Sequence, residues 1–320
     1  MQVALMRLDG LGGTVTLSDQ AKKIYQLTGE PVILITRGYE GLFKDNPYVA
    51  EIINVGGEDW QKCLSRFVNS FDILGELRFI VGKWHFNRAT LPVAETHWRR
   101  WEQLYFRFPL LRSPQVSSYH DLDTYDLNQT QILDMSLGLP FSTIECEIYA
   151  EEPVKSLPPQ YILVNNGIDT QYKGSRQTKM YPYWDQLYRL LPLPMVQVGT
   201  AFDSLIQGVE CDLRGKTSLP ELTYVLRNAT LVLCTEGGIM HLSYAASCKS
   251  VVVMRGPSAG PINKYPGHVV VDSYICSNCW WVTSDWFCRC ALGIDNVCMR
   301  SISPERVAFV VERRLHEDLA

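Results

Sequence analysis

The stretch that decides the fold is Asp212–Ser258, DLRGKTSLPELTYVLRNATLVLCTEGGIMHLSYAASCKSVVVMRGPS. Apolar residues at three- to four-residue spacing predict a helix over Leu219–Asn228, and a Ser–Glu capping box precedes it. The apolar runs Leu231–Cys234 and Ser250–Met254 are rich in β-branched residues, which is typical of strands buried on both faces. A second helix begins near Ile239, between these strands, so the stretch predicts a βαβ unit.

The sharp turn of this unit falls at Thr235–Gly238, directly after the first apolar run. In open α/β sheets, ligands bind beyond the carboxyl ends of the strands. Gly237 and Gly238 allow the backbone to approach a phosphate closely, and the following helix directs its positive end to the same place. The turn is therefore a candidate anion-binding site. The alternative is a plain tight turn, with His241 as an ordinary helix residue.

Strands and helices alternate on both sides of this stretch, which predicts an α/β chain with parallel sheets. A polar, Pro-rich segment at Tyr149–Pro159 suits a boundary between two such halves. The other predicted strands are Val3–Met6, Pro31–Thr36, Glu51–Val55, Leu77–Val81, Tyr161–Val164, Met195–Val198 and His268–Asp272. The other predicted helices lie around Leu17–Leu27, over Leu122–Leu137 and over Ser303–Leu315, the last capped by Ser303.

The length and charge of the chain exclude some classes of protein. A chain of 320 residues is long enough for two medium-sized cores. Its formal net charge of -4 argues against a large nucleic-acid interface, because such proteins usually carry a basic face. No apolar run is long enough to span a membrane, and the N-terminal MQVALMRLDGLGG lacks the regions of a secretion signal. A cytoplasmic location is therefore expected.

Several segments resemble one enzyme family, in the same order along the chain. LRGKTSLPEL (Leu213–Leu222) is similar to the family's Leu-x-Gly-Lys-Thr-Ser-Leu-x-Glu-Leu. EGGIMHLS (Glu236–Ser243) resembles its Asp-Ser/Thr-Gly-x-Met-His-Leu-Ala, and RGPS (Arg255–Ser258) resembles its Phe-Gly-Pro-Thr-like turn. Further matches are LFKDNPYVAEII (Leu42–Ile53), TKMYP (Thr178–Pro182) and the cysteine-bearing C-terminal segment. The chain thus resembles glycosyltransferase family nine, the heptosyltransferase type.

This resemblance implies a GT-B fold, in which two Rossmann-like domains place their parallel sheets on either side of a central cleft. The expected parts are an acceptor-side domain (1–155), a donor-binding domain with a cysteine-rich loop (156–302) and a C-terminal helix (303–320). The resemblance also implies an inverting transferase with no catalytic metal. Its donor would be a nucleotide-diphosphate sugar, ADP-heptose in the family, and its acceptor a saccharide, glycolipid or protein. Peripheral contact with a membrane surface is compatible with such an acceptor.

The donor-binding residues are likewise implied by the resemblance. Glu236 stands where the family has Asp and would hold a donor hydroxyl or the turn, while His241 would face the diphosphate or the sugar. Lys179 matches the family lysine that pairs with donor phosphate, and Lys173 and Arg176 are rival cations in the same loop. The implied set is Lys179, Asp203 (toward the ribose), Glu236, Gly237, Gly238, Met240 and His241.

The catalytic base is where the chain departs from the family. The family's N-terminal turn ends in Gly-Asp, and that Asp receives the acceptor proton, but Gly13 stands at its place here. We assign Asp9, four residues earlier, as the base, with Gly10, Gly12 and Gly13 forming the acceptor-side loop. Asp19 lies on the following helix, and an Asx cap of the turn is the alternative role for Asp9.

Five of the ten cysteines lie between Cys276 and Cys298. Cys276 and Cys279 have knuckle spacing, and four thiolates predict a tetrahedral structural site for zinc, with iron as the rival. The family pattern selects Cys276, Cys279, Cys290 and Cys298 as the ligands, which leaves Cys288 as the spare. Buried or free thiols are the alternative.

Two further readings of the function follow from the sequence. Because Gly13 replaces the family's Asp, the chain is alternatively a catalytically inactive nucleotide-sugar-binding or scaffold protein. A transferase that acts on modified phage DNA keeps the same fold, but the net charge of -4 argues against it. The basic, aromatic run Trp98–Arg112 is interpreted as a core helix with a solvated arginine face; contact with anionic sugars, a lipid head group or nucleic acid is the alternative.

Overall fold

The computed structural model describes residues 1–78, 80–87, 89–91, 126–167, 177–258, 260–276, 279, 285, 288–290 and 292–317. The chain divides into two compact units. Among the described residues, the first unit holds 1–91 and 127–150, and the second holds 126 and 151–317. Membrane-spanning helices are absent from this described part, since none of its helices combines the required length with sufficient hydropathy.

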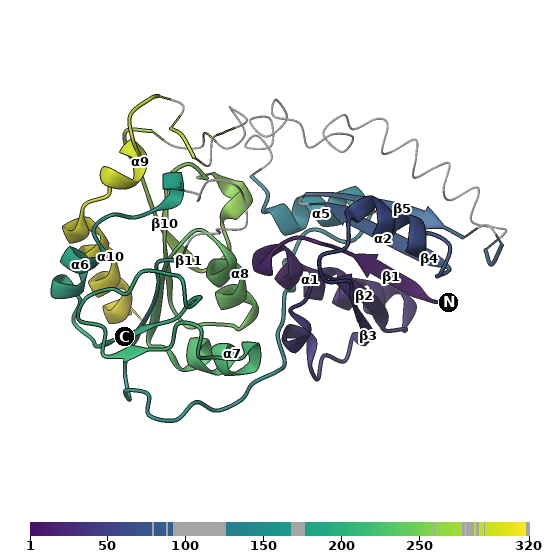
Figure 1. The fold of residues 1–320 in the computed structure, drawn as a ribbon, viewed down its shortest axis with the longest axis horizontal. Helices are drawn as coiled ribbons and strands as arrows, with labels where there is room; N and C mark the ends of the chain where they lie inside the picture. The colour runs from purple at the N-terminus through teal and green to yellow at the C-terminus, as the bar shows by residue number, and fades with distance from the viewer. Residues whose placement is uncertain are drawn as a thin grey trace. The chain divides into compact units, whose positions relative to one another are not determined.

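The first unit is built on a sheet with the strand order β3-β2-β1-β4-β5, whose strands are drawn purple to blue in Figure 1. β1 lies at the centre, and all its residues are buried. The strands are β1 (Val3–Met6), β2 (Val32–Thr36), β3 (Val49–Asn54), β4 (Ile73–Arg78) and β5 (Val81–Phe86). The helices are α1 (Leu11–Thr28), η1 (Glu40–Phe43), α2 (Trp60–Phe67) and α5 (Gln129–Leu137).

The prediction of a single strand at Leu77–Val81 is wrong. β4 ends at Arg78 and β5 begins at Val81, and the two strands pair in the antiparallel direction. A connection of two residues can join only antiparallel strands, because a parallel crossover needs about a dozen. The first sheet is therefore mostly, rather than wholly, parallel.

The helix predicted around Leu17–Leu27 also begins earlier than expected. α1 starts at Leu11, so Gly12 and Gly13 lie in its first turn, and of the three loop glycines only Gly10 precedes it. Glycine weakens a helix mainly in its interior, so two glycines at the N terminus do not stop it from forming. The predicted Leu122–Leu137 helix ends as expected but is capped at Asn128, and residues 122–125 lie outside the described part.

A buried ionic network joins α1 to α5. Lys23 Nζ lies 2.9 Å from Asp19 Oδ2 and 2.6 Å from Asp134 Oδ2, and all three side chains are fully buried. Gln20 Nε2 donates to both carboxylates, and Lys23 also donates to the carbonyl of Thr143 at 2.8 Å. Burial raises the pKa of Asp134 far above its usual range, and the negative charge of Asp19 raises it further. Asp134 therefore stays protonated at neutral pH.

Replacing Asp134 with asparagine is expected to preserve stability at pH 8. The unfolded chain loses the Asp134 proton at about pH 4 whereas the folded chain keeps it, so the free energy of unfolding of the wild type falls as pH rises through neutrality. Asparagine does not titrate, so the variant should lose less stability than the wild type between pH 5 and pH 8. Urea unfolding at both pH values measures this difference.

Asp134→Ala is the matched control, because it leaves Lys23 and Gln20 without one acceptor each. It should be less stable than the wild type at both pH values, by roughly 1–3 kcal/mol. If Asp134→Asn loses as much stability at pH 8 as Asp134→Ala, the Asp134 carboxyl is not held protonated.

The second unit, drawn teal to yellow in Figure 1, carries a sheet with the order β11-β10-β9-β6-β7-β8, all of whose described strands are parallel. The strands are β6 (Ile162–Asn165), β7 (Met195–Gln197), β8 (Cys211–Asp212), β9 (Leu231–Thr235), β10 (Val251–Arg255) and β11 (His268–Asp272). The helices are η4 (Gln177–Lys179), α6 (Trp184–Leu187), η5 (Tyr188–Leu190), α7 (Leu219–Asn228), α8 (Gly238–Ala245), η6 (Pro261–Asn263), α9 (Val297–Arg300) and α10 (Pro304–Glu317). The βαβ unit predicted from the opening stretch is confirmed.

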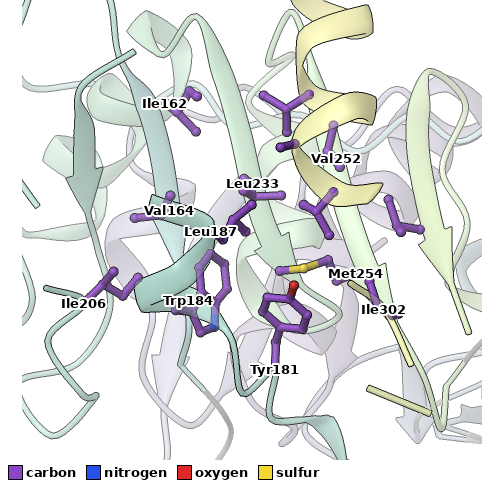
Figure 2. Close-up of a cluster of buried hydrophobic side chains, with 14 of the residues drawn as sticks. Ile162, Val164, Tyr181, Trp184, Leu187, Ile206, Leu233, Val252, Met254 and Ile302 are labelled. Carbon is purple, nitrogen blue, oxygen red and sulfur yellow. The ribbon is translucent and has the colours of Figure 1, made fainter. Parts of the chain in front are cut away.

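One hydrophobic cluster of this unit lies on the face of the sheet covered by α6 and α10. The helices α7 and α8 cover the other face (Figure 1), where Val225, Leu226, Met240 and Leu242 are also fully buried. Figure 2 shows Leu233 of β9 and Met254 of β10 beside Trp184 of α6. Val307 and Val311 of α10 are fully buried in the same cluster. The C-terminal helix is thus part of the second unit's core, and Ser303 caps it by accepting from the Arg306 N–H at 3.2 Å.

Candidate functional site

The turn between β9 and α8 lies at the carboxyl edge of the second sheet. Glu236 follows β9, Gly237 precedes α8, and Gly238 is the first helical residue. Among the described residues, no side chain caps the N terminus of α8, and a Cβ added at Gly237 would meet no atom within 4 Å. The first N–H groups of a helix attract anions, and the open space at Gly237 lets one approach them.

Beside this turn lies a buried ion pair between Lys179 of η4 and Glu236. Both side chains are almost fully buried, and Ser258 Oγ donates to Glu236 Oε2 at 2.8 Å. Burial alone would raise the pKa of Glu236, but the Lys179 charge, the hydrogen bonds from Lys179 and Ser258, and the His241 charge together bring it below its usual range. Glu236 is therefore a permanent carboxylate that holds the Lys179 ammonium next to the α8 turn.

His241, on the first turn of α8, is held by a tyrosine. Its Nδ1 lies 2.7 Å from the Tyr265 hydroxyl, and the Tyr265 ring stacks on Tyr244 at 4.4 Å between centroids. The neighbouring His268 has its pKa lowered to about 3 by burial and by the His241 charge, so it stays neutral. Met240 is fully buried, as expected of a side chain that packs in the core.

Asp203 lies in the loop after β7, at the same edge of the sheet. Its Oδ2 accepts the Thr200 N–H at 2.7 Å. A Cβ at Gly167 or at Gly199 would lie within 3 Å of that oxygen, so both glycines make room for the carboxylate. In this structure Asp203 holds the turn of the loop, and a contact with ribose would be additional to that role.

In the first unit, Asp9 lies between β1 and α1. Arg7, which is buried, donates from Nε to Asp9 Oδ2 at 2.9 Å and from Nη1 to Thr16 Oγ1 at 2.7 Å. The Asp9 side chain is 35% exposed. A Cβ added at Gly13 would lie 2.7 Å from Asp9 Cβ and 3.0 Å from Asp9 Oδ2, so the Asp9 carboxylate fills the space next to position 13. Asp19, in contrast, is buried in the ionic network.

The predicted metal ligands lie in the C-terminal part of the second unit. Cys276, Cys279 and Cys290 are half-buried, Cys298 is buried, and all four are free thiols. Within the described part of the chain, no three His, Cys, Asp or Glu side chains gather closely enough to hold a metal ion. Burial raises the pKa of Cys279 to about 11, and the charges of Cys276 and Cys290 add to this shift.

Two residues of the site were missed by sequence reasoning. Ser258 was noted as part of a Gly-Pro-Ser turn, and its position after a strand is the signal that could have identified it. Tyr265 lies 24 residues from His241, with no motif that connects the two. Three predicted features, Lys173, Arg176 and the run Trp98–Arg112, lie outside the described residues.

The sequence model of glycosyltransferase family 9 (heptosyltransferase) matches residues 199–262, which include the loop after β7 and the β9–α8 turn. No curated protein matches the chain in sequence.

Among solved structures, the chain is similar to a family 9 glycosyl transferase from Veillonella parvula DSM 2008, with 15% identity, a TM-score of 0.62, and coverage of 99% of this chain and 97% of that one. It is also similar to the ADP-heptose LPS heptosyltransferase II of E. coli, with 13% identity, a TM-score of 0.62 and full coverage of both chains. A third similar structure is the dodecameric iron-containing heptosyltransferase TibC of E. coli in complex with ADP-D-β-D-heptose. It shares 15% identity with this chain at a TM-score of 0.66, and the match covers 99% of this chain and 76% of TibC. At such identities the likeness establishes the fold, and it confirms the GT-B assignment.

Proposed function

We propose that this chain is a glycosyltransferase of family 9 that transfers a sugar from an ADP-sugar of the ADP-heptose type to a hydroxyl group of a saccharide, glycolipid or protein acceptor. The observation that carries the proposal is the buried Lys179–Glu236 pair beside the open N terminus of α8. Residues 199–262, the segment that matches the family model, contain Glu236 and the first turn of α8. The donor class is supported by two of the similar structures, one described as an ADP-heptose enzyme and one as a complex with ADP-D-β-D-heptose.

The second unit would bind the donor. The diphosphate would lie at the N terminus of α8, where backbone N–H groups stabilise the negative charge that develops as the diphosphate leaves. Lys179 would add a positive charge, held in place by Glu236 and, through it, by Ser258. The Tyr265 hydroxyl fixes the orientation of the His241 ring, which would face the diphosphate or the sugar of the donor.

The first unit would supply the base. The acceptor hydroxyl would lose its proton to the Asp9 carboxylate as its oxygen forms the new bond to the anomeric carbon. The bond from that carbon to the diphosphate oxygen breaks in the same displacement, which inverts the anomeric centre, and the nucleoside diphosphate carries the electron pair away. Asp9 suits this role because it is partly exposed and Arg7 fixes its orientation. Its carboxylate also fills the space beside Gly13, where the family's Asp would begin.

The cysteine cluster would hold a structural zinc or iron ion on Cys276, Cys279, Cys290 and Cys298. Thiolates are the ligands that these metals prefer in closed, tetrahedral sites, and the spacing of Cys276 and Cys279 is that of a metal-binding knuckle. The description of TibC as iron-containing favours iron as a candidate. When bound, such a metal would fasten the C-terminal segment and would take no part in transfer.

A donor screen tests the proposal. The purified chain is incubated with ADP-, UDP- and GDP-sugars, with and without candidate acceptors, and mass spectrometry reads the free nucleotide and the sugar products. We expect consumption of an ADP-sugar above the others. If no nucleotide sugar is bound or consumed, the proposal fails; binding without consumption supports the catalytically inactive alternative that Gly13 motivates. About one zinc or iron per chain in the same sample supports the cysteine site.

A further inference from the structure

Phe202 is the most exposed large apolar side chain in the described part of the molecule, at 93%. It lies in the loop between β7 and β8, next to Asp203. Isolated exposed apolar residues are common, so exposure by itself indicates nothing. Two further observations indicate a role for Phe202: the hydrogen bonds that hold its loop, and the distance of that loop from the α8 turn.

The loop is held rigidly beneath Phe202. Gln197, which is fully buried, donates to the Ser204 carbonyl at 2.8 Å and accepts the Ile206 N–H at 2.9 Å. Asn166 donates to the same Ser204 carbonyl at 2.8 Å. On the other flank, Asp203 caps the Thr200 N–H, and Gly215 donates to the Gly199 carbonyl at 2.8 Å. These bonds fix the backbone on both sides of Phe202, which lowers the entropic cost of ordering the loop around a ligand, while the exposed ring stays accessible to a planar group.

The position of the loop relative to the α8 turn matches the dimensions of a nucleoside diphosphate. Both lie at the carboxyl edge of one sheet, whose order β9-β6-β7 places them two strands apart. Neighbouring strands are spaced by about 4.8 Å, so the separation across the sheet is roughly 10 Å. In a nucleoside diphosphate, the ribose sets the base apart from the diphosphate by a comparable length. A diphosphate at the N terminus of α8 would therefore bring the base to the loop after β7.

We infer that Phe202 forms the stacking surface for the nucleobase of the donor. This inference rests on the proposed function, and it adds the residue that binds the base. Aromatic side chains stack on the faces of all bases, and the larger purine ring system gains more contact than a pyrimidine. Phe202 thus contributes affinity and favours a purine nucleotide, while Asp203, held on the same loop, lies where the ribose would pass.

Calorimetric titration of ADP and UDP into the wild type, Phe202→Ala and Phe202→Trp tests the inference. Phe202→Ala should weaken ADP binding on the order of tenfold, which is the contribution of one stacked base, and UDP binding by less. Phe202→Trp should retain ADP affinity, and its added indole fluorescence should be quenched by ADP. Phe309→Ala, which removes another exposed phenylalanine of the same unit, is the matched control and should bind as the wild type does.

The outcomes separate this inference from the proposed function. Unchanged ADP affinity in Phe202→Ala, with a measurable affinity in the wild type, overturns the role of Phe202 and leaves the proposed function standing. A wild type that binds no nucleotide overturns both. Because Phe202 is almost fully exposed, its replacement should not alter the melting temperature, which is measured on each variant.

Discussion

Replacing Asp9 with asparagine is expected to lower the turnover of sugar transfer by about 10²- to 10⁴-fold, the usual contribution of a general base. Asparagine keeps the size of the side chain and an oxygen that can accept from Arg7 Nε, so the turn between β1 and α1 should be preserved. What it lacks is the ability to take the acceptor proton. The loss should therefore appear in kcat rather than in donor affinity, because the predicted donor site lies in the second unit.

Steady-state kinetics and ADP titration on the same variant measure kcat and donor affinity separately. Asp45→Asn is a suitable control, because it removes one negative charge from an exposed position of the same unit. It should leave both quantities unchanged. If Asp9→Asn transfers sugar at the wild-type rate, Asp9 is not the base, and its role is limited to the ion pair with Arg7.

Local signals in the sequence were enough for most of the second unit. The helix predicted at Leu219–Asn228 is α7 with the same bounds, because its apolar spacing and its capping box both act within one or two turns. The strands around it were recognisable because they are buried on both faces and therefore read as continuous apolar runs. The resemblance to the family then indicated that the turn after the first of these strands binds the donor.

Contacts between distant parts of the chain could not be predicted from local sequence patterns. Lys179 and Glu236 lie 57 residues apart, and each was assigned to a different part of the donor rather than to the other. The hairpin of β4 and β5 was missed because a two-residue connection left the apolar pattern continuous across it. In the same way, the space beside Gly13 that Asp9 fills depends on the path of the backbone, which residue spacing does not specify.

Replacing Gly237 with alanine is expected to weaken ADP binding strongly without destabilising the protein. Gly237 has an extended backbone that any residue adopts, and an added Cβ would meet no described atom within 4 Å. The folded state should therefore tolerate the methyl group, and the smaller conformational freedom of alanine in the unfolded chain should add a few tenths of a kcal/mol of stability. If the open space at Gly237 is where the diphosphate lies, however, the methyl group occupies it. Crowding of this kind costs about 1–3 kcal/mol, which corresponds to a rise in the ADP dissociation constant of roughly 10- to 100-fold.

Gly57→Ala is the matched control for this substitution. Gly57 lies in the first unit, and a Cβ there would also meet no described atom within 4 Å. The two variants thus make the same chemical change in equally open surroundings, one at the predicted donor site and one away from it. Both should melt at or above the wild-type temperature.

Calorimetric titration of ADP into the wild type, Gly237→Ala and Gly57→Ala is the most direct test of the claim that the β9–α8 turn holds the donor diphosphate. We expect the wild type and Gly57→Ala to bind ADP equally, and Gly237→Ala to bind it at least about tenfold more weakly while its melting temperature is undiminished. Equal ADP affinity in all three proteins would contradict the claim.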